Sequence, residues 1–139
     1  MFDFFGLRKK AGKPKILIVE DEPDLVKTIQ DRLKMNGYPT ITAENGKVGL
    51  EKAIKEKPDI ILLDVNMPVM DGLEMLEALT KYPEGTDCLV IMLTVRSQKE
   101  DVARAEACGV EDYLVKPFDL DELLEKIDSV LKRRQTTDK

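Results

Sequence analysis

The sequence predicts an α/β fold in which five helices cover both faces of a doubly wound, five-stranded parallel sheet. Two observations carry this prediction: short apolar runs alternate with amphipathic stretches five times along the chain, and three of the runs are apolar nearly throughout. Runs that are apolar nearly throughout are typical of strands buried on both faces. The alternation indicates successive βα units, whose strands lie parallel in one sheet.

Three central strands and two edge strands are expected. The runs 15–19, 59–63 and 89–93 are dominated by Ile, Leu and Val, which predicts the central strands. The segments 38–43 and 113–115 are shorter or more polar, as strands near the edge of a sheet often are.

The helices are expected at about 23–36, 46–56 and 71–80, from Ser97 to before Gly109, and from Asp119 onward. Apolar residues spaced three or four apart place one face of each helix on the sheet. These residues are Val26, Ile29 and Leu33; Val48, Leu50 and Ile54; Leu73, Leu76 and Leu79; and Leu120, Leu123, Leu124, Ile127 and Leu131.

The last two helices are expected to differ in packing. The fourth opens with a capping-box pattern at 97–100, but its inward face is only Val102, Ala105 and small neighbours. The fifth opens with Asp119 and Glu122, again a capping box, and has a leucine-rich face. The fourth helix should therefore be weakly anchored and the fifth the best packed.

A single domain is predicted at 15–132, between a leader at 1–14 and a polar tail at 133–139. The length of 139 residues leaves room for one compact domain. The leader holds three of the four Phe residues, followed by basic residues at 8–10. It is expected to be a disordered tail or a flap over the domain; the alternative is a weak membrane or partner contact through residues 1–10. The chain is expected to stand alone, with a fragment of a longer protein as the alternative.

Composition excludes several classes of function. With 22 Lys and Arg against 27 Asp and Glu, the net charge of −5 argues against direct nucleic-acid binding. The chain has no histidine, which excludes Ser-His-Asp and Cys-His triads, imidazole metal sites and an internal phosphohistidine. Cys88 and Cys108 fit neither a metal cluster nor a disulfide scaffold. No apolar run approaches the roughly 18 residues of a transmembrane helix, so a cytoplasmic protein is expected.

Ionisable residues follow the predicted strands at the point where each strand ends. Glu20 and Asp21 follow the first, Asp64 the third, Thr94 the fourth and Lys116 the fifth. Because ligands of open α/β sheets bind at the carboxyl ends of the strands, these side chains are expected to converge on one edge.

Three adjacent carboxylates repel one another unless a cation neutralises them, and an all-oxygen set suits Mg²⁺. We expect Asp21 and Asp64 to bind the ion directly and Glu20 to reach it through water. Lys116 is expected to act as a point charge for phosphoryl oxygens and Thr94 as a hydroxyl donor to the same group.

These acidic residues and Thr94 also have alternative, purely structural roles. The acids can simply cap the helices that follow them, which is the expected role of Asp24 and Asp119. The hydroxyl of Thr94, taken alone, is as readily explained by a hydrogen bond to nearby backbone.

These residues fall in motifs that, in combination, are highly specific. The chain resembles the receiver domain of two-component response regulators over about residues 15–132. The motifs are Glu20–Glu22 (EDE), Leu62–Pro68 (LLDVNMP), Asp71–Gly72, Leu93–Thr94 and Tyr113–Phe118 (YLVKPF).

The resemblance implies a flavodoxin-like sheet of order 2-1-3-4-5, with Asp64 as the phosphoacceptor. It also implies that Asn66 supplies a backbone carbonyl to Mg²⁺, that Tyr113 is an aromatic switch coupled to Thr94, and that a cis peptide bond precedes Pro117. The family usually has a small residue after the hydroxyl residue, whereas this chain has Val95.

The expected function is phosphoryl transfer from a sensor histidine kinase or phosphotransfer protein to Asp64, read out through contacts with a downstream protein target. Such a domain catalyses its own phosphorylation and dephosphorylation but turns over no other substrate. One alternative is a Mg²⁺-dependent phosphohydrolase, which Asn66 disfavours because an amide cannot be its general acid. Another is a scaffold independent of phosphorylation, which the complete acid, hydroxyl and lysine set disfavours.

Overall fold

The structure is a computed structural model that describes residues 12–82, 87–95 and 99–137. Strands and helices alternate strictly along the chain. In order they are β1 (Ile16–Val19), α1 (Pro23–Met35), β2 (Thr40–Ala43), α2 (Gly46–Glu56), β3 (Ile60–Asp64), α3 (Gly72–Leu79), β4 (Leu89–Val95), α4 (Lys99–Ala107), β5 (Asp112–Lys116) and α5 (Leu120–Thr137).

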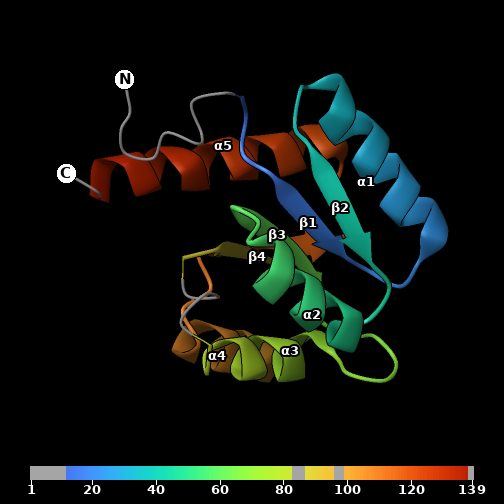
Figure 1. The fold of residues 1–139 in the computed structure, drawn as a ribbon, viewed down its shortest axis with the longest axis vertical. Helices are drawn as coiled ribbons and strands as arrows, with labels where there is room; N and C mark the ends of the chain where they lie inside the picture. Colours follow the sequence, from blue (N-terminus) through green and yellow to red (C-terminus); the bar gives the residue numbers. More distant parts are fainter. Residues whose placement is uncertain (1–11, 83–86, 96–98, 138–139) are drawn as a thin grey trace.

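The five strands form one parallel sheet in the order β2-β1-β3-β4-β5. The predicted fold is therefore confirmed, with β1, β3 and β4 in the centre and β2 and β5 at the edges. Helices α1 and α5 cover one face of the sheet, and α2, α3 and α4 cover the other (Figure 1).

The core consists of two apolar layers, because alternate residues of each strand point to opposite faces. Ile16 and Ile18 of β1 pack toward α1 and α5, whereas Leu17 and Val19 pack toward the other helices. The central strands are buried on both sides, which explains their nearly continuous apolar sequences.

Helix α5 is as well packed as its sequence predicts. Leu123 and Ile127 are fully buried, and so is Val130, which the periodicity argument omitted. The predicted capping box is present: the Glu122 N–H donates to Asp119 Oδ1 at 2.8 Å, and the Asp119 N–H donates to Glu122 Oε1 at 3.1 Å. The helix continues to Thr137, so most of the predicted polar tail is helical.

Helix α4 has the thin apolar anchor that its sequence predicts. Among its described side chains, 101–107, only that of Ala105 is buried, while Val102 is half-buried. Residues 1–11 of the leader predicted at 1–14, residues 97 and 98 of the capping box predicted at 97–100, and the side chains of residues 99 and 100 fall outside what the structure describes.

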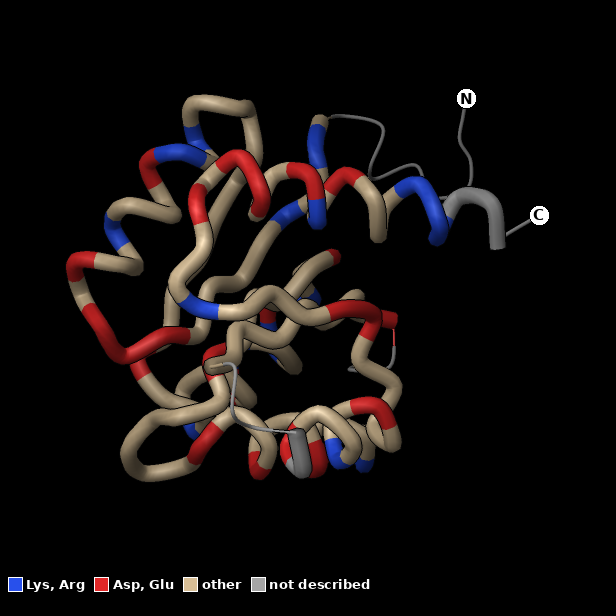
Figure 2. The backbone as a smooth tube through the Cα atoms, turned by 180° about the vertical axis from the view of Figure 1, so that it is seen from behind, with Lys and Arg blue, Asp and Glu red and all other residues tan. Residues whose placement is uncertain are grey.

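Charged residues of both signs are interspersed along the described backbone (Figure 2). Exposed pairs such as Lys27–Asp31 and Arg32–Asp121 bring opposite charges together. None of the helices in the described ranges combines the length and apolar character of a bilayer-spanning segment.

The loop after β3 is held closely against its neighbours by two glycines. A side chain at Gly72 would collide with the Asp64 carbonyl, and one at Gly46 would lie 2.5 Å from the Met70 carbonyl oxygen. Hydrogen bonds from the Gly72 N–H to the Val65 carbonyl and from the Gly46 N–H to the Met70 carbonyl, both 2.9 Å, fix the two ends of this loop. The residues that follow Asp64 therefore have a defined path.

Val69 lies in this loop with φ of 70° and a side chain that is 77% exposed. A β-branched residue in the left-handed region is strained, and asparagine adopts the same region at a lower cost. We predict that Val69→Asn raises the free energy of unfolding by about 0.5–1 kcal/mol, measured by urea denaturation. The same change at Val115, an exposed strand residue, should lower stability; a loss at both positions would contradict the strain.

Candidate functional site

The five side chains predicted to converge lie at the carboxyl ends of four adjacent strands. Glu20 and Asp21 follow β1. Asp64 and Lys116 are the last residues of β3 and β5, and Thr94 is the last but one of β4. The register places Asp64 opposite Leu93, and Val95 opposite Lys116. Parallel pairing thus brings together residues up to 96 positions apart in sequence.

The three carboxylates form one cluster. Glu20, Asp21 and Asp64 each offer an oxygen, and these oxygens all lie within 4.8 Å of one another. Glu20 and Asp64 are 2% and 4% exposed, whereas Asp21 is open to solvent. Lys116 reaches into the cluster, with its Nζ donating to Glu20 Oε1 at 2.9 Å and to Asp64 Oδ1 at 3.1 Å. Because Glu20 Oε2 also accepts the Glu22 N–H at 3.2 Å, both of its oxygens have partners.

Thr94 and Tyr113 lie on the side of the sheet that α4 covers. The Thr94 hydroxyl is buried and donates to the Val95 carbonyl at 3.2 Å. A backbone hydrogen bond of this kind was the alternative role for Thr94 in the sequence analysis. The Tyr113 hydroxyl donates to Glu106 Oε2 of α4 at 2.9 Å. Both residues line one narrow hollow beneath α4.

Two further expectations have different outcomes. The peptide bond between Lys116 and Pro117 is cis, as the resemblance implies. Asp24, in contrast, does not cap α1: the cap position is Glu22, and no side-chain cap bond is made there. The Asp24 carbonyl instead accepts the Thr28 hydroxyl within the helix at 2.8 Å.

Residues 16–128 match the family model described as the response regulator receiver domain. The chain belongs to this family. The receiver is 38% identical over 117 residues to protein PilH of Pseudomonas aeruginosa, covering 84% of this chain and 97% of PilH. It is 37% identical over 124 residues to the transcriptional regulatory protein PrrA of Mycobacterium tuberculosis, covering 89% of this chain and 52% of PrrA. The receiver thus spans about half the length of the transcriptional regulators that it matches.

Solved structures agree with this membership. The chemotaxis response regulator CheY4 of Vibrio cholerae superposes with a TM-score of 0.79 at 34% identity, covering 84% of this receiver and 98% of that chain. The receiver domain of the sensor histidine kinase PA1611 of Pseudomonas aeruginosa, described with a magnesium ion coordinated in its active-site cleft, gives 0.78 at 28% identity, covering 86% and 98%.

Burial shifts the pKa of two carboxyl groups of the cluster, Glu20 and Asp64. Burial raises the pKa of Glu20 to about 7, although the hydrogen bond from Lys116 opposes the shift. Burial also raises the pKa of Asp64, and the Lys116 charge again opposes it. The pKa of Lys116 is lowered by burial but raised overall by its hydrogen bonds and by the charges of Glu20 and Asp64. One ammonium group therefore faces more negative charge than it can neutralise.

The donor set of the cluster fits a hard divalent cation. All the candidate atoms are oxygens, and the exposed Asp21 leaves one side open to water. Mg²⁺ usually keeps several waters and takes only one or two carboxylates, which such an open cluster permits. Asn66, whose carbonyl the resemblance implies as a ligand, follows Asp64 by two positions in the glycine-held loop.

The raised pKa of Glu20 predicts a pH-dependent stability without divalent ions. Between the ordinary pKa of 4.5 and about 7, the folded state binds more protons than the unfolded state, so stability falls as pH rises. Relative to Glu20→Gln, the wild-type free energy of unfolding should fall by roughly 1–2 kcal/mol between about pH 5 and pH 8. Excess MgCl₂ at the higher pH should reduce this loss. A difference between the two proteins that does not vary with pH would contradict the prediction.

Proposed function

We propose that Asp64 accepts a phosphoryl group from the phosphohistidine of a sensor histidine kinase or phosphotransfer protein in a Mg²⁺-dependent reaction. The observation that carries this proposal is the contact of Lys116 with Asp64 and Glu20, within a carboxylate cluster at the ends of the strands. Family membership supports it, because receivers are signalling domains of this kind. The phosphohistidine is proposed to lie on another molecule, since these 139 residues contain no histidine.

Mg²⁺ is proposed to bind directly to Asp21 and Asp64, to Glu20 through water and to the Asn66 backbone carbonyl. Bound there, the ion supplies positive charge for the carboxylates and for the oxygens of the incoming phosphoryl group. The all-oxygen donor set supports this choice, as does the magnesium-containing cleft described for the related PA1611 receiver.

In the transfer step, an Asp64 carboxylate oxygen attacks phosphorus while the bond from phosphorus to the donor's imidazole nitrogen breaks. The product is an aspartyl phosphate and a neutral histidine on the donor. Lys116 then donates to a phosphoryl oxygen in place of its Asp64 contact. The Thr94 hydroxyl exchanges its bond with the Val95 carbonyl for one with another phosphoryl oxygen.

Hydrolysis of this acyl phosphate by water in the same pocket returns the receiver to its resting state. The domain is thus proposed to catalyse its own phosphorylation and dephosphorylation and to act on no other substrate. The signal passes to a downstream protein through the surface of α4, β5 and α5, with Thr94 and Tyr113 as the switch residues. A cytoplasmic location is proposed, where Cys88 and Cys108 remain free thiols.

Asp64→Asn is predicted to abolish phosphorylation, because the amide cannot form the acyl phosphate. Incubation with Mg²⁺ and acetyl phosphate, followed by intact mass, should show a phosphoryl adduct on the wild type and none on the variant. Asp31→Asn, which removes an exposed carboxylate of α1, is the matched control and should react like the wild type. An adduct forming equally fast on Asp64→Asn would refute the proposal, and turnover without any adduct would indicate a phosphohydrolase.

Val95→Ala is predicted to open access to the phosphorylated carboxylate. Val95 is 38% exposed at the end of β4, and its stiff β-branched side chain follows Thr94 directly. Removal of two methyl groups should speed adduct decay or small-donor phosphorylation by roughly 2–10-fold, which corresponds to a barrier lowered by about 0.4–1.4 kcal/mol. Val115→Ala, equally exposed on β5, is the control. Unchanged rates for Val95→Ala in both assays would disprove the steric role.

A further inference from the structure

Helix α4 covers a narrow hollow on one face of the sheet. The residues that line the hollow are Val65, Met92, Thr94 and Tyr113 on the sheet side and Asp101, Val102 and Ala105 of α4. It has no room for a water molecule. Tyr113 therefore has no space to turn inward unless α4 moves away from the sheet.

Polar contacts hold α4 on two sides. Residues two apart on a helix point in different directions. Arg104 accordingly reaches α3 while Glu106 reaches the Tyr113 hydroxyl on β5. Contacts between charged or polar groups thus take the place of the apolar packing that α4 lacks.

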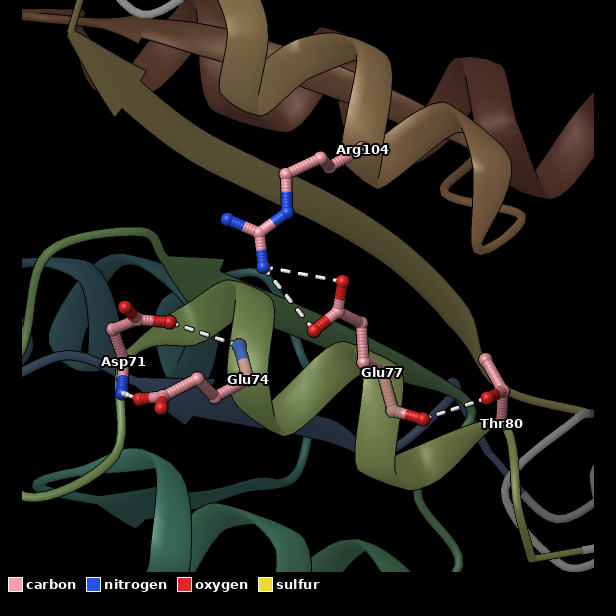
Figure 3. A network of polar contacts seen from close by, with 5 residues as sticks. All are labelled: Asp71, Glu74, Glu77, Thr80 and Arg104. Carbon is pink, nitrogen blue, oxygen red and sulfur yellow. Dashed lines mark hydrogen bonds and ion pairs between the residues drawn. The ribbon is translucent and has the colours of Figure 1, made fainter.

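Arg104 of α4 contacts both carboxylate oxygens of Glu77 on α3. The Arg104 Nη2 donates to both oxygens of Glu77, at 3.2 and 3.1 Å, across the space between the two helices (Figure 3). Both side chains are about half exposed, at 50% and 47%. Movement of α4 away from α3 would lengthen both of these hydrogen bonds and weaken the ion pair.

Glu77 is carried by a helix that is firmly fixed. Leu73, Met75 and Leu76 of α3 are buried in the core. At its start, Asp71 and Glu74 form a complete capping box, with hydrogen bonds of 2.8 and 2.9 Å (Figure 3). The ion pair therefore joins a loosely packed helix to a well-packed one.

We propose that the Arg104–Glu77 ion pair is a latch that holds α4 in its resting position and must open before Tyr113 can turn inward. This inference rests on the proposed function, since it assumes that a phosphoryl group on Asp64 draws Thr94 and α4 into a second arrangement. Opening the latch uses part of the favourable interaction energy that the phosphoryl group provides. The strength of the latch therefore sets how strongly the receiver favours the resting state.

The expected change in affinity for a phosphoryl mimic follows from how exposed the Arg104–Glu77 pair is. Half-exposed ion pairs are weak, and salt screens them. Loss of the latch should therefore increase the apparent affinity for a phosphoryl mimic by roughly 2–5-fold, since each tenfold corresponds to about 1.4 kcal/mol. Raising NaCl from about 50 mM to 500 mM should reduce the difference between wild type and variant.

The test measures binding of beryllofluoride, a phosphoryl mimic, to the full chain in excess Mg²⁺ by calorimetry. Glu77→Gln and Arg104→Gln should each bind it 2–5-fold more tightly than the wild type, and the double variant no more tightly than either. Both single variants are needed, because Asp71 and Asp101 also act on the Arg104 charge and offer it other partners once Glu77 is neutral. Asp121→Asn is the matched control, since it breaks another Arg–carboxylate pair between helices, with Arg32 of α1.

Unchanged or weaker binding by both variants would overturn the latch, as would an equal increase in Asp121→Asn. Additive gains in the double variant would also overturn it, because two partners of one contact cannot contribute twice. Failure of the proposed function gives a different result: the wild type would not bind beryllofluoride, or would bind it as well after Asp64→Asn.

Discussion

The arrangement of the site depends on one ammonium group that is shared by two buried carboxylates. Lys116 contacts both Glu20 and Asp64, while Asp21 adds a third carboxylate at the open side of the cluster. Burial raises the pKa of Glu20 and of Asp64, because desolvation disfavours the charged forms, and the single positive charge of Lys116 only partly opposes this. The cluster is therefore ready to accept a divalent cation. A phosphoryl group on Asp64 would in turn compete for the Lys116 ammonium.

The sheet makes this concentration of charge possible. Apolar strands buried on both faces end at the same edge, and the first polar residue of each is brought to its neighbours by parallel register. The glycine at position 72 lets α3 begin close to the Asp64 carbonyl, which fixes the loop carrying Asn66. On the other side, α4 packs weakly through Ala105 and is tied to α3 and β5 by polar contacts. The site thus has one well-packed side, at α3, and one weakly packed side, at α4.

Local patterns predicted most of this arrangement. The apolar runs predicted the strands and their order from centre to edge, and the strand-end positions of Glu20, Asp64 and Lys116 predicted the cluster, because parallel pairing leaves few other ways to place them. The contacts of long, exposed side chains could not be predicted in the same way. The bond between Tyr113 and Glu106 and the pair between Arg104 and Glu77 depend on how α4 lies against its neighbours, which periodicity does not specify. The expected cap at Asp24 was wrong because α1 already begins at Pro23, which places Asp24 inside the first turn of the helix.

Charge added at Asp64 is proposed to be read out at α4 and β5, and amide hydrogen exchange tests this readout most directly. Exchange should be measured on the full chain in Mg²⁺, with and without beryllofluoride. Protection should change around residues 94–115 and little around 25–36, because Thr94 and Tyr113 lie beside the weakly packed α4 whereas α1 is anchored through Ile29 and Leu33. A uniform change over the chain, or a change confined to α1, would contradict it.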